Sequence, residues 1–218
     1  MSERVIDILI DSFPKLLSYG IKVTIPLTVL SFLLALAISI VVAVIMYAKV
    51  KVLNALCRLY IWIIRGTPLI VQLYIVFYGL PSVGIMLEAF PAAVLVFGFN
   101  EAAYMAESIR AALEAIPSVQ LKAGRSEGAG FTRVMTKIVI PQAARIAFPS
   151  VMNSLISMVK GTSLAASITV TEMFRQAQII NGRVYESMAL YCEVALIYLI
   201  FCTILTFVQR RIEKKLEF

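Results

Sequence analysis

Two short polar segments interrupt long apolar stretches of this chain, RGTP at Arg65–Pro68 and KGTS at Lys160–Ser163. Gly and Pro free the polar backbone groups of a helix, and at membrane depth such groups are tolerated only beside protein or a water-filled cavity. The cationic and hydroxyl side chains there can bind a polar solute. The breaks therefore predict a translocation path. A proline kink used for packing, with Arg65 and Lys160 reaching to a polar layer, is the alternative.

A third apolar stretch carries Asn100 and Glu101 near its middle. An ionisable group within a membrane span is a candidate for function by default, because its burial in hydrocarbon is costly. Glu107 is a weaker candidate, since Arg110 lies three residues on and can pair with it on a helix. The candidates for the substrate path are Arg65, Thr67, Gln72, Asn100, Glu101, Lys160, Thr162 and Ser163.

Several kinds of chemistry are absent from the sequence. There is no His, and the three Cys residues show no CxxC spacing, which argues against a metal site or a disulfide framework. No GxxxxGK[ST] motif occurs, so the chain is not itself a nucleotide-binding subunit. We expect no catalytic residue, no metal ligand and no cofactor in this chain, which is thus not an enzyme.

The composition predicts an all-α polytopic membrane protein. Of the 218 residues 61% are hydrophobic, against about 45 to 50% in an ordinary globular domain. The apolar stretches are long enough to cross a bilayer. We expect one transmembrane domain over residues 1–218, with five spans at roughly 16–47, 59–80, 90–112, 146–170 and 189–208.

The basic residues predict the orientation. Five spans place the two termini on opposite sides, and Lys and Arg gather in the segments 49–58, 110–145 and 210–215. By the positive-inside rule this side is cytoplasmic. The C-terminus is then in the cytoplasm and the N-terminus outside. The same rule explains the net charge of +7 without nucleic-acid binding.

A polar segment at 117–141 separates the third and fourth spans on the cytoplasmic side. We expect a short helix, a bend at Gly128 in the left-handed conformation, and a second short helix that ends before Pro141. These elements would form a compact projection that contacts a partner in water. An amphipathic helix lying on anionic lipid is the alternative.

Four stretches, together with the loop around Gly128, resemble the permease subunits of ABC importers, in the polar amino acid branch, over nearly the full length. These are Arg65–Pro81, Asn100–Leu113, Ile140–Arg145 and Thr162–Ser167. The resemblance implies the type I ABC importer permease fold in the bacterial cytoplasmic (inner) membrane, with 117–141 as a coupling helix that contacts a cytoplasmic ABC ATPase. The residues implied in this contact are Gln120, Lys122, Ala123, Arg125 and Gly128.

The resemblance also implies partners and a function. ATP and Mg²⁺ would bind the ATPase subunits, a second permease subunit would complete a homo- or heterodimer, and an extracytoplasmic protein would deliver the amino acid. Membrane lipid surrounds the chain. The expected function is ATP-driven import of a polar amino acid by alternating access. An ATPase-independent secondary transporter or channel-like protein is the alternative.

Three positions depart from the family pattern. Lys122 begins KAG where an acidic residue followed by two Ala is usual, Gly161 replaces an acid, and Glu101 replaces a small or hydroxyl residue. We hypothesise that Glu101 offsets the acid missing at Gly161 and lies near the substrate's ammonium group. The sequence TEMFRQAQII at Thr171–Ile180 is most similar to importers of cystine and other sulfur amino acids. Glutamine or a similar polar amino acid is the alternative substrate.

Overall fold

The computed structural model describes residues 3–126 and 128–216, and within these residues it contains helices and no strand. The predicted all-α class is confirmed. The α-helices are α1 (Glu3–Tyr19), α2 (Ile25–Ala48), α3 (Lys51–Gly66), α4 (Leu69–Tyr74), α5 (Ala89–Glu114), α6 (Ser118–Ser126), α7 (Phe131–Val134), α8 (Ile140–Gly161), α9 (Met173–Val184) and α10 (Ser187–Leu216). The π and 3-10 segments are η1 (Gly20–Thr24), η2 (Ile75–Gly79), η3 (Leu80–Val83), η4 (Met135–Val139) and η5 (Thr162–Ile168).

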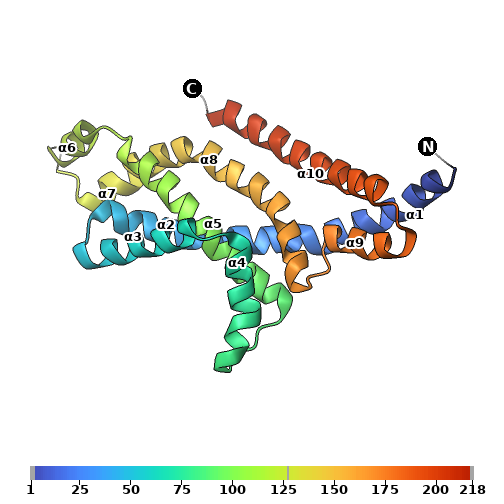
Figure 1. Cartoon of the computed structure of the whole chain (residues 1–218). Coiled ribbons are helices and arrows are strands. Elements are labelled where there is room, and N and C mark those ends of the chain that lie inside the picture. Colours follow the sequence, from blue (N-terminus) through green and yellow to red (C-terminus); the bar gives the residue numbers. More distant parts are fainter. Residues whose placement is uncertain (1–2, 127, 217–218) are drawn as a thin grey trace.

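The first helical rod is much longer than predicted. α1, η1 and α2 form one helix of 46 residues, Glu3–Ala48, which at 1.5 Å per residue is about 69 Å long. It runs across the molecule in Figure 1 to the turn before α3. The predicted span 16–47 lies inside this rod. The rod is about twice as long as the hydrocarbon core is thick, so part of it extends beyond the bilayer.

The π segments η1, η2 and η4 each end two residues before a proline, namely Pro26, Pro81 and Pro141. A proline has no N–H, and its ring crowds the carbonyl four residues earlier. A π turn widens the helix so that this carbonyl moves away. In η4, for example, the Ile140 N–H donates to the carbonyl of Met135, five residues back. The helices therefore continue through these prolines without a break.

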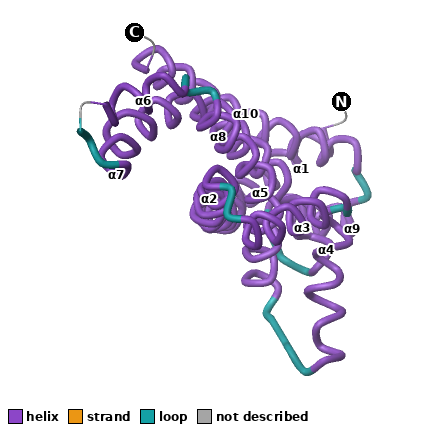
Figure 2. The backbone as a smooth tube through the Cα atoms, turned by 90° about the vertical axis from the view of Figure 1, so that its left-hand side faces the viewer, coloured by secondary structure: helices purple, strands orange, loops and turns teal. Residues whose placement is uncertain are grey.

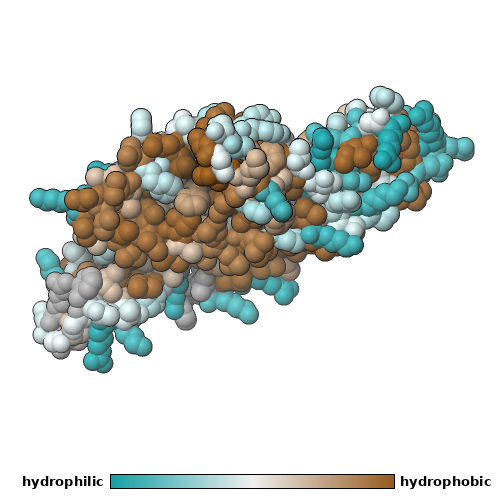
Figure 3. Space-filling model, turned by 90° about the horizontal axis from the view of Figure 1, so that it is seen from below, coloured by the Kyte–Doolittle hydropathy of each residue, from teal (hydrophilic) through white to brown (hydrophobic). Residues whose placement is uncertain are grey.

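Three described helices are long and apolar enough to cross a membrane, Glu3–Ala48, Ala89–Glu114 and Ser187–Lys215. Lys51–Gly66 and Leu69–Val83 together make a fourth candidate that is bent by 103°. α8 does not meet this criterion, so the count of five spans stays a prediction. On the face shown in Figure 3, hydrophobic side chains form a broad field through the middle, and most hydrophilic ones lie toward the two ends.

Small residues allow α5 to lie at the centre of the bundle. α2 packs along α5, which also contacts α8 and α3. Short side chains let helix backbones approach closely in a membrane, and Gly98 of α5 lies directly against the Leu34 side chain of α2. The fully buried alanines of α5 are Ala92, Ala93, Ala102, Ala103 and Ala106.

We expect Gly98→Ala to destabilise the protein. The added Cβ would lie 2.6 Å from Leu34 Cδ2 and 2.9 Å from its Cγ, and such overpacking costs about 1 to 3 kcal/mol. The thermal denaturation midpoint of the detergent-solubilised protein should fall. Gly182→Ala on α9 is the matched control, because no atom lies within 4 Å of its added Cβ. Equal midpoints for the two variants would show that the α2–α5 contact can relax.

α6 and α7 stand together at one end of the molecule (Figures 1 and 2). α6 ends at Ser126, Gly128 beyond it has the predicted left-handed conformation with φ 81°, and the Ala129 N–H donates to the Gly124 carbonyl at 3.1 Å. This is the hydrogen bond of a Schellman helix end. The expectation of a second short helix that ends before Pro141 is wrong, because α7, η4 and α8 are continuous from Phe131 to Gly161.

Candidate functional site

The first polar break bends the chain between α3 and α4. Thr67 is extended, with φ −122° and ψ 144°, as expected for a residue before proline. Gln72 satisfies the freed groups, since its Nε2 donates to the Ile64 carbonyl at 2.9 Å and to Thr67 Oγ1 at 2.8 Å. Asn100 Nδ2 of α5 donates to Gln72 Oε1 at 3.0 Å. Three predicted path residues, Thr67, Gln72 and Asn100, thus hold the bend against α5.

Arg65 and Glu101 line one polar cleft of about 450 Å³ between α3, α5 and α8. The Arg65 guanidinium lies over the ring of Tyr104, 5.1 Å from its centroid, which is cation–π distance. The Ser154 hydroxyl is a hydrogen-bonding partner of Glu101. The other lining residues are Glu107, Ser108, Ser150, Asn153 and Ser157. Glu107 is paired with Arg110, which leaves Arg65 and Glu101 as a cation and an anion that match the two charges of a zwitterion.

The second polar break does not face this cleft. Thr162 is fully buried and its hydroxyl donates to the Val159 carbonyl at 2.7 Å. The Ser163 hydroxyl donates to the Lys160 carbonyl at 2.8 Å. Lys160 and Ser163 line a different cleft, of about 530 Å³, with Tyr198 and other residues of α10. The structure therefore places the eight predicted path residues in three groups.

Sequence reasoning missed Glu172, which is fully buried at the start of α9. Its carboxylate accepts hydrogen bonds from the backbone N–H groups of Phe174 and Arg175, at 2.8 and 2.7 Å, and from the Tyr198 hydroxyl at 2.9 Å. Burial raises the pKa of Glu172, and these hydrogen bonds oppose that shift. Glu172 thus joins the start of α9 to α10. Its position before a helix was the only signal, and Glu is not a preferred N-cap residue.

The predicted coupling residues lie on or beside α6. Lys122, Ala123 and Gly128 are exposed, whereas Gln120 Oε1 accepts a hydrogen bond from Gln142 Nε2 of α8 at 2.7 Å. The side chain of Arg125 lies outside the described part of the chain. α6 packs closely against α7 at Gly124, where an added Cβ would lie 3.0 Å from Val134 Cγ2. Gln120 thus anchors α6, and Lys122 and Ala123 present an open surface.

The family described as "Binding-protein-dependent transport system inner membrane component" matches residues 35–218. The chain belongs to this family. It is therefore a multi-pass inner membrane protein of an ABC importer, and the predicted importer permease is confirmed.

Two relatives that align with nearly the whole chain are amino acid permeases. The L-cystine transport system permease protein TcyB of Bacillus subtilis is 41% identical over 212 residues, covering 97% of this chain and 91% of that protein. The probable amino-acid ABC transporter permease protein PatM of Vibrio harveyi is 40% identical, covering 96% of this chain and 95% of that protein. The permease described here is thus similar to them from end to end.

Solved structures show the same fold. A chain from the crystal structure of an amino acid ABC transporter with histidines superposes with a TM-score of 0.90 at 30% identity, covering 99% of this permease and all of that chain. The MetNI methionine ABC transporter, at 20% identity, shares the fold with a TM-score of 0.79 over all of both chains. The predicted type I ABC importer permease fold is confirmed. Both neighbours are subunits of ABC transporters.

Proposed function

We propose that this permease imports cystine or a closely related polar amino acid, in a complex whose separate ATPase subunits bind ATP and Mg²⁺. The cleft between α3, α5 and α8 carries the proposal, because Arg65 and Glu101 line it together. A guanidinium matches the carboxylate of an amino acid and a carboxylate matches its ammonium group. The 41% identity to an L-cystine permease supports the choice of cystine.

The proposed orientation places α6 and α7 in the cytoplasm. Figure 1 shows them at the same end as the turn from α2 to α3, which carries Lys49 and Lys51. Tyr47 at the end of α2 packs against the cluster around Val134, which fixes these elements to one end. By the positive-inside rule this basic end is cytoplasmic. The N-terminus and α9 are then outside, where a binding protein delivers the amino acid.

Coupling to the ATPase takes place through α6. Lys122 and Ala123 are exposed there, and Lys122 meets an acidic residue of the ATPase. α7, η4 and α8 form one continuous helix, so a displacement of this end is transmitted along α8 to the cleft. A second permease subunit, identical or different, completes the path. Alternating access then moves the amino acid inward.

Uptake competition tests the substrate. The complete transporter with its ATPase and binding protein is reconstituted in vesicles, and uptake of labelled cystine is measured with an excess of each unlabelled amino acid. Cystine and its closest sulfur analogues should suppress uptake most strongly, with basic amino acids having little effect. Suppression by arginine or glutamine but not by unlabelled cystine would reject the proposed substrate.

A further inference from the structure

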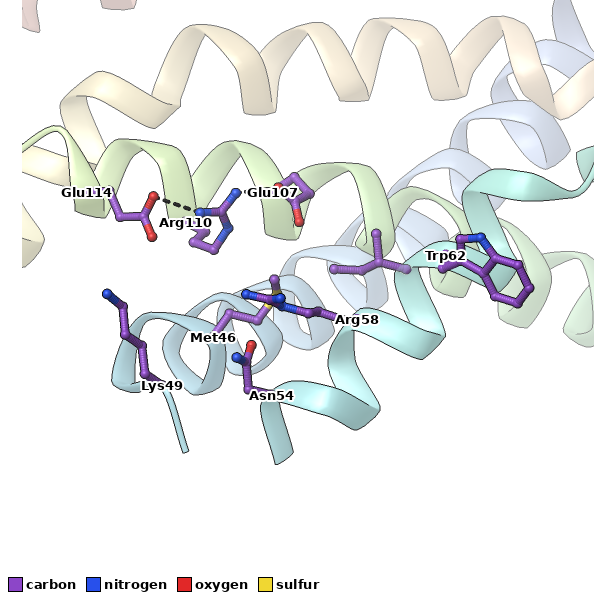
Figure 4. Close-up of a pocket in the computed structure, with 9 residues that line it drawn as sticks. Met46, Lys49, Asn54, Arg58, Trp62, Glu107, Arg110 and Glu114 are labelled. Atoms are coloured by element: carbon purple, nitrogen blue, oxygen red, sulfur yellow. Dashed lines mark hydrogen bonds and ion pairs between the residues drawn. The ribbon is translucent and has the colours of Figure 1, made fainter. Parts of the chain in front are cut away.

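A second charged cleft, of about 580 Å³, lies between the α2–α3 turn and the end of α5. Figure 4 shows Lys49, Asn54 and Arg58 on one side of it and Glu107, Arg110 and Glu114 on the other. The α2–α3 turn lies at the end of the molecule that also holds α6 and α7 (Figure 1). None of the predicted path or coupling residues lines it.

The acidic side chains of this cleft are already paired. Arg110 donates to Glu107 and to Glu114, at 2.7 Å in each case. Lys49 and Arg58, in contrast, have no ion-pair or hydrogen-bond partner for their side chains in residues 3–126 and 128–216. Three cations against two anions leave the cleft with one net positive charge. A ligand with one negative charge would balance it.

The cleft also has an apolar side. Met46 and Ile61 line its interior and are only 7% exposed, and Trp62 at its edge is 73% exposed. The outer face of α3 continues with the exposed apolar residues Val52 and Leu56. Tryptophan is enriched where a membrane meets water. The cleft thus combines a cationic part with an apolar part at that boundary.

We propose that this cleft binds the headgroup of an anionic phospholipid with a single phosphodiester charge, such as phosphatidylglycerol. Arg58 and Lys49 contact the phosphate, the Asn54 amide bonds to the glycerol part of the headgroup, and the acyl chains lie along Trp62 and the apolar face of α3. Basic pockets between helices on the cytoplasmic side of a membrane recognise lipid headgroups of this kind. A soluble phosphate would make no use of the apolar side.

Native mass spectrometry of the complete transporter, purified from mixed phosphatidylglycerol and phosphatidylcholine micelles, tests the site. The wild-type permease should retain phosphatidylglycerol in preference to phosphatidylcholine. Arg58→Gln and Lys49→Gln should each lower this retention about fivefold, and Arg58→Lys should preserve it. Lys51→Gln is the matched control, since Lys51 is exposed on α3, the helix that carries Arg58, but does not line the cleft.

Several results would overturn the proposal. Equal retention of the two lipids, or equal losses in Lys51→Gln and Arg58→Gln, would show a nonspecific charge effect. Displacement of the lipid by inorganic phosphate would identify a site for soluble phosphate. If Arg58→Gln fails to assemble, Lys49→Gln alone decides, because Lys49 is exposed at the turn and its side chain has no partner to lose.

Discussion

Glu101→Gln is expected to lower amino acid uptake by about 10- to 100-fold, because a hydrogen bond to a charged group contributes about 1.5 to 3 kcal/mol. Glu101 shares its cleft with Arg65, and we propose that its carboxylate faces the substrate's ammonium group. The amide of Gln keeps the shape and loses the charge. The loss should therefore appear in uptake of zwitterionic substrate, while basal ATP hydrolysis by the complex stays close to the wild-type rate.

The control is Asp7→Asn, which makes the same acid-to-amide change at an exposed position on α1, away from the cleft. It should leave uptake unchanged. Thermal denaturation of both variants separates transport from folding. Wild-type uptake by Glu101→Gln would show that its charge has no part in substrate binding.

Gly124→Leu is expected to uncouple ATP hydrolysis from transport and to lower uptake at least about tenfold, since a misplaced contact helix costs binding energy at the interface. The Cβ of any residue here would lie 3.0 Å from Val134 Cγ2 and 3.4 Å from Ile138 Cδ1. The contact at 3.0 Å is tighter than an ordinary van der Waals contact, so Val134 or α6 must shift, and the bulk of Leu enters the cleft of about 320 Å³ between α6, α7 and η4. Uptake and ATPase co-purification are the two measurements.

Gly130→Leu is the matched control for Gly124→Leu. It adds the same side chain close by, where no atom lies within 4 Å of the new Cβ, and its backbone φ is not left-handed. Uptake should be nearly normal. If Gly124→Leu retained wild-type uptake and ATPase binding, the packing of α6 would not matter for coupling.

Some features of this fold follow from local sequence. The left-handed Gly128 was predicted because glycine adopts positive φ at helix ends without strain. The interruption at Arg65–Pro68 was predicted because Gly and Pro free backbone groups of a helix, and the chain bends there by 103°. In contrast, the second short helix was expected to end before Pro141. The π turn before this proline keeps α7, η4 and α8 continuous, and no local pattern distinguishes such a turn from a break.

The grouping of the polar residues depends on contacts between distant segments. The Asn100–Gln72 hydrogen bond joins residues 28 apart, and the contact between Glu172 and Tyr198 joins two helices. The sequence predicts the same role for the two polar breaks that contain Arg65 and Lys160. Helix packing places these two side chains in different clefts. Residue type thus indicated which side chains are functional candidates, and only the packing of α5 against α2, α3 and α8 showed which ones share a cleft.

ATP-dependent cystine uptake tests the central claim most directly. Vesicles containing the permease, its ATPase and its binding protein are loaded with ATP and Mg²⁺, and uptake of labelled cystine is compared with uptake without ATP and under an imposed proton or sodium gradient. We expect cystine uptake only with ATP, and no effect of the proton or sodium gradient. Cystine uptake driven by a gradient in the absence of the ATPase would contradict it.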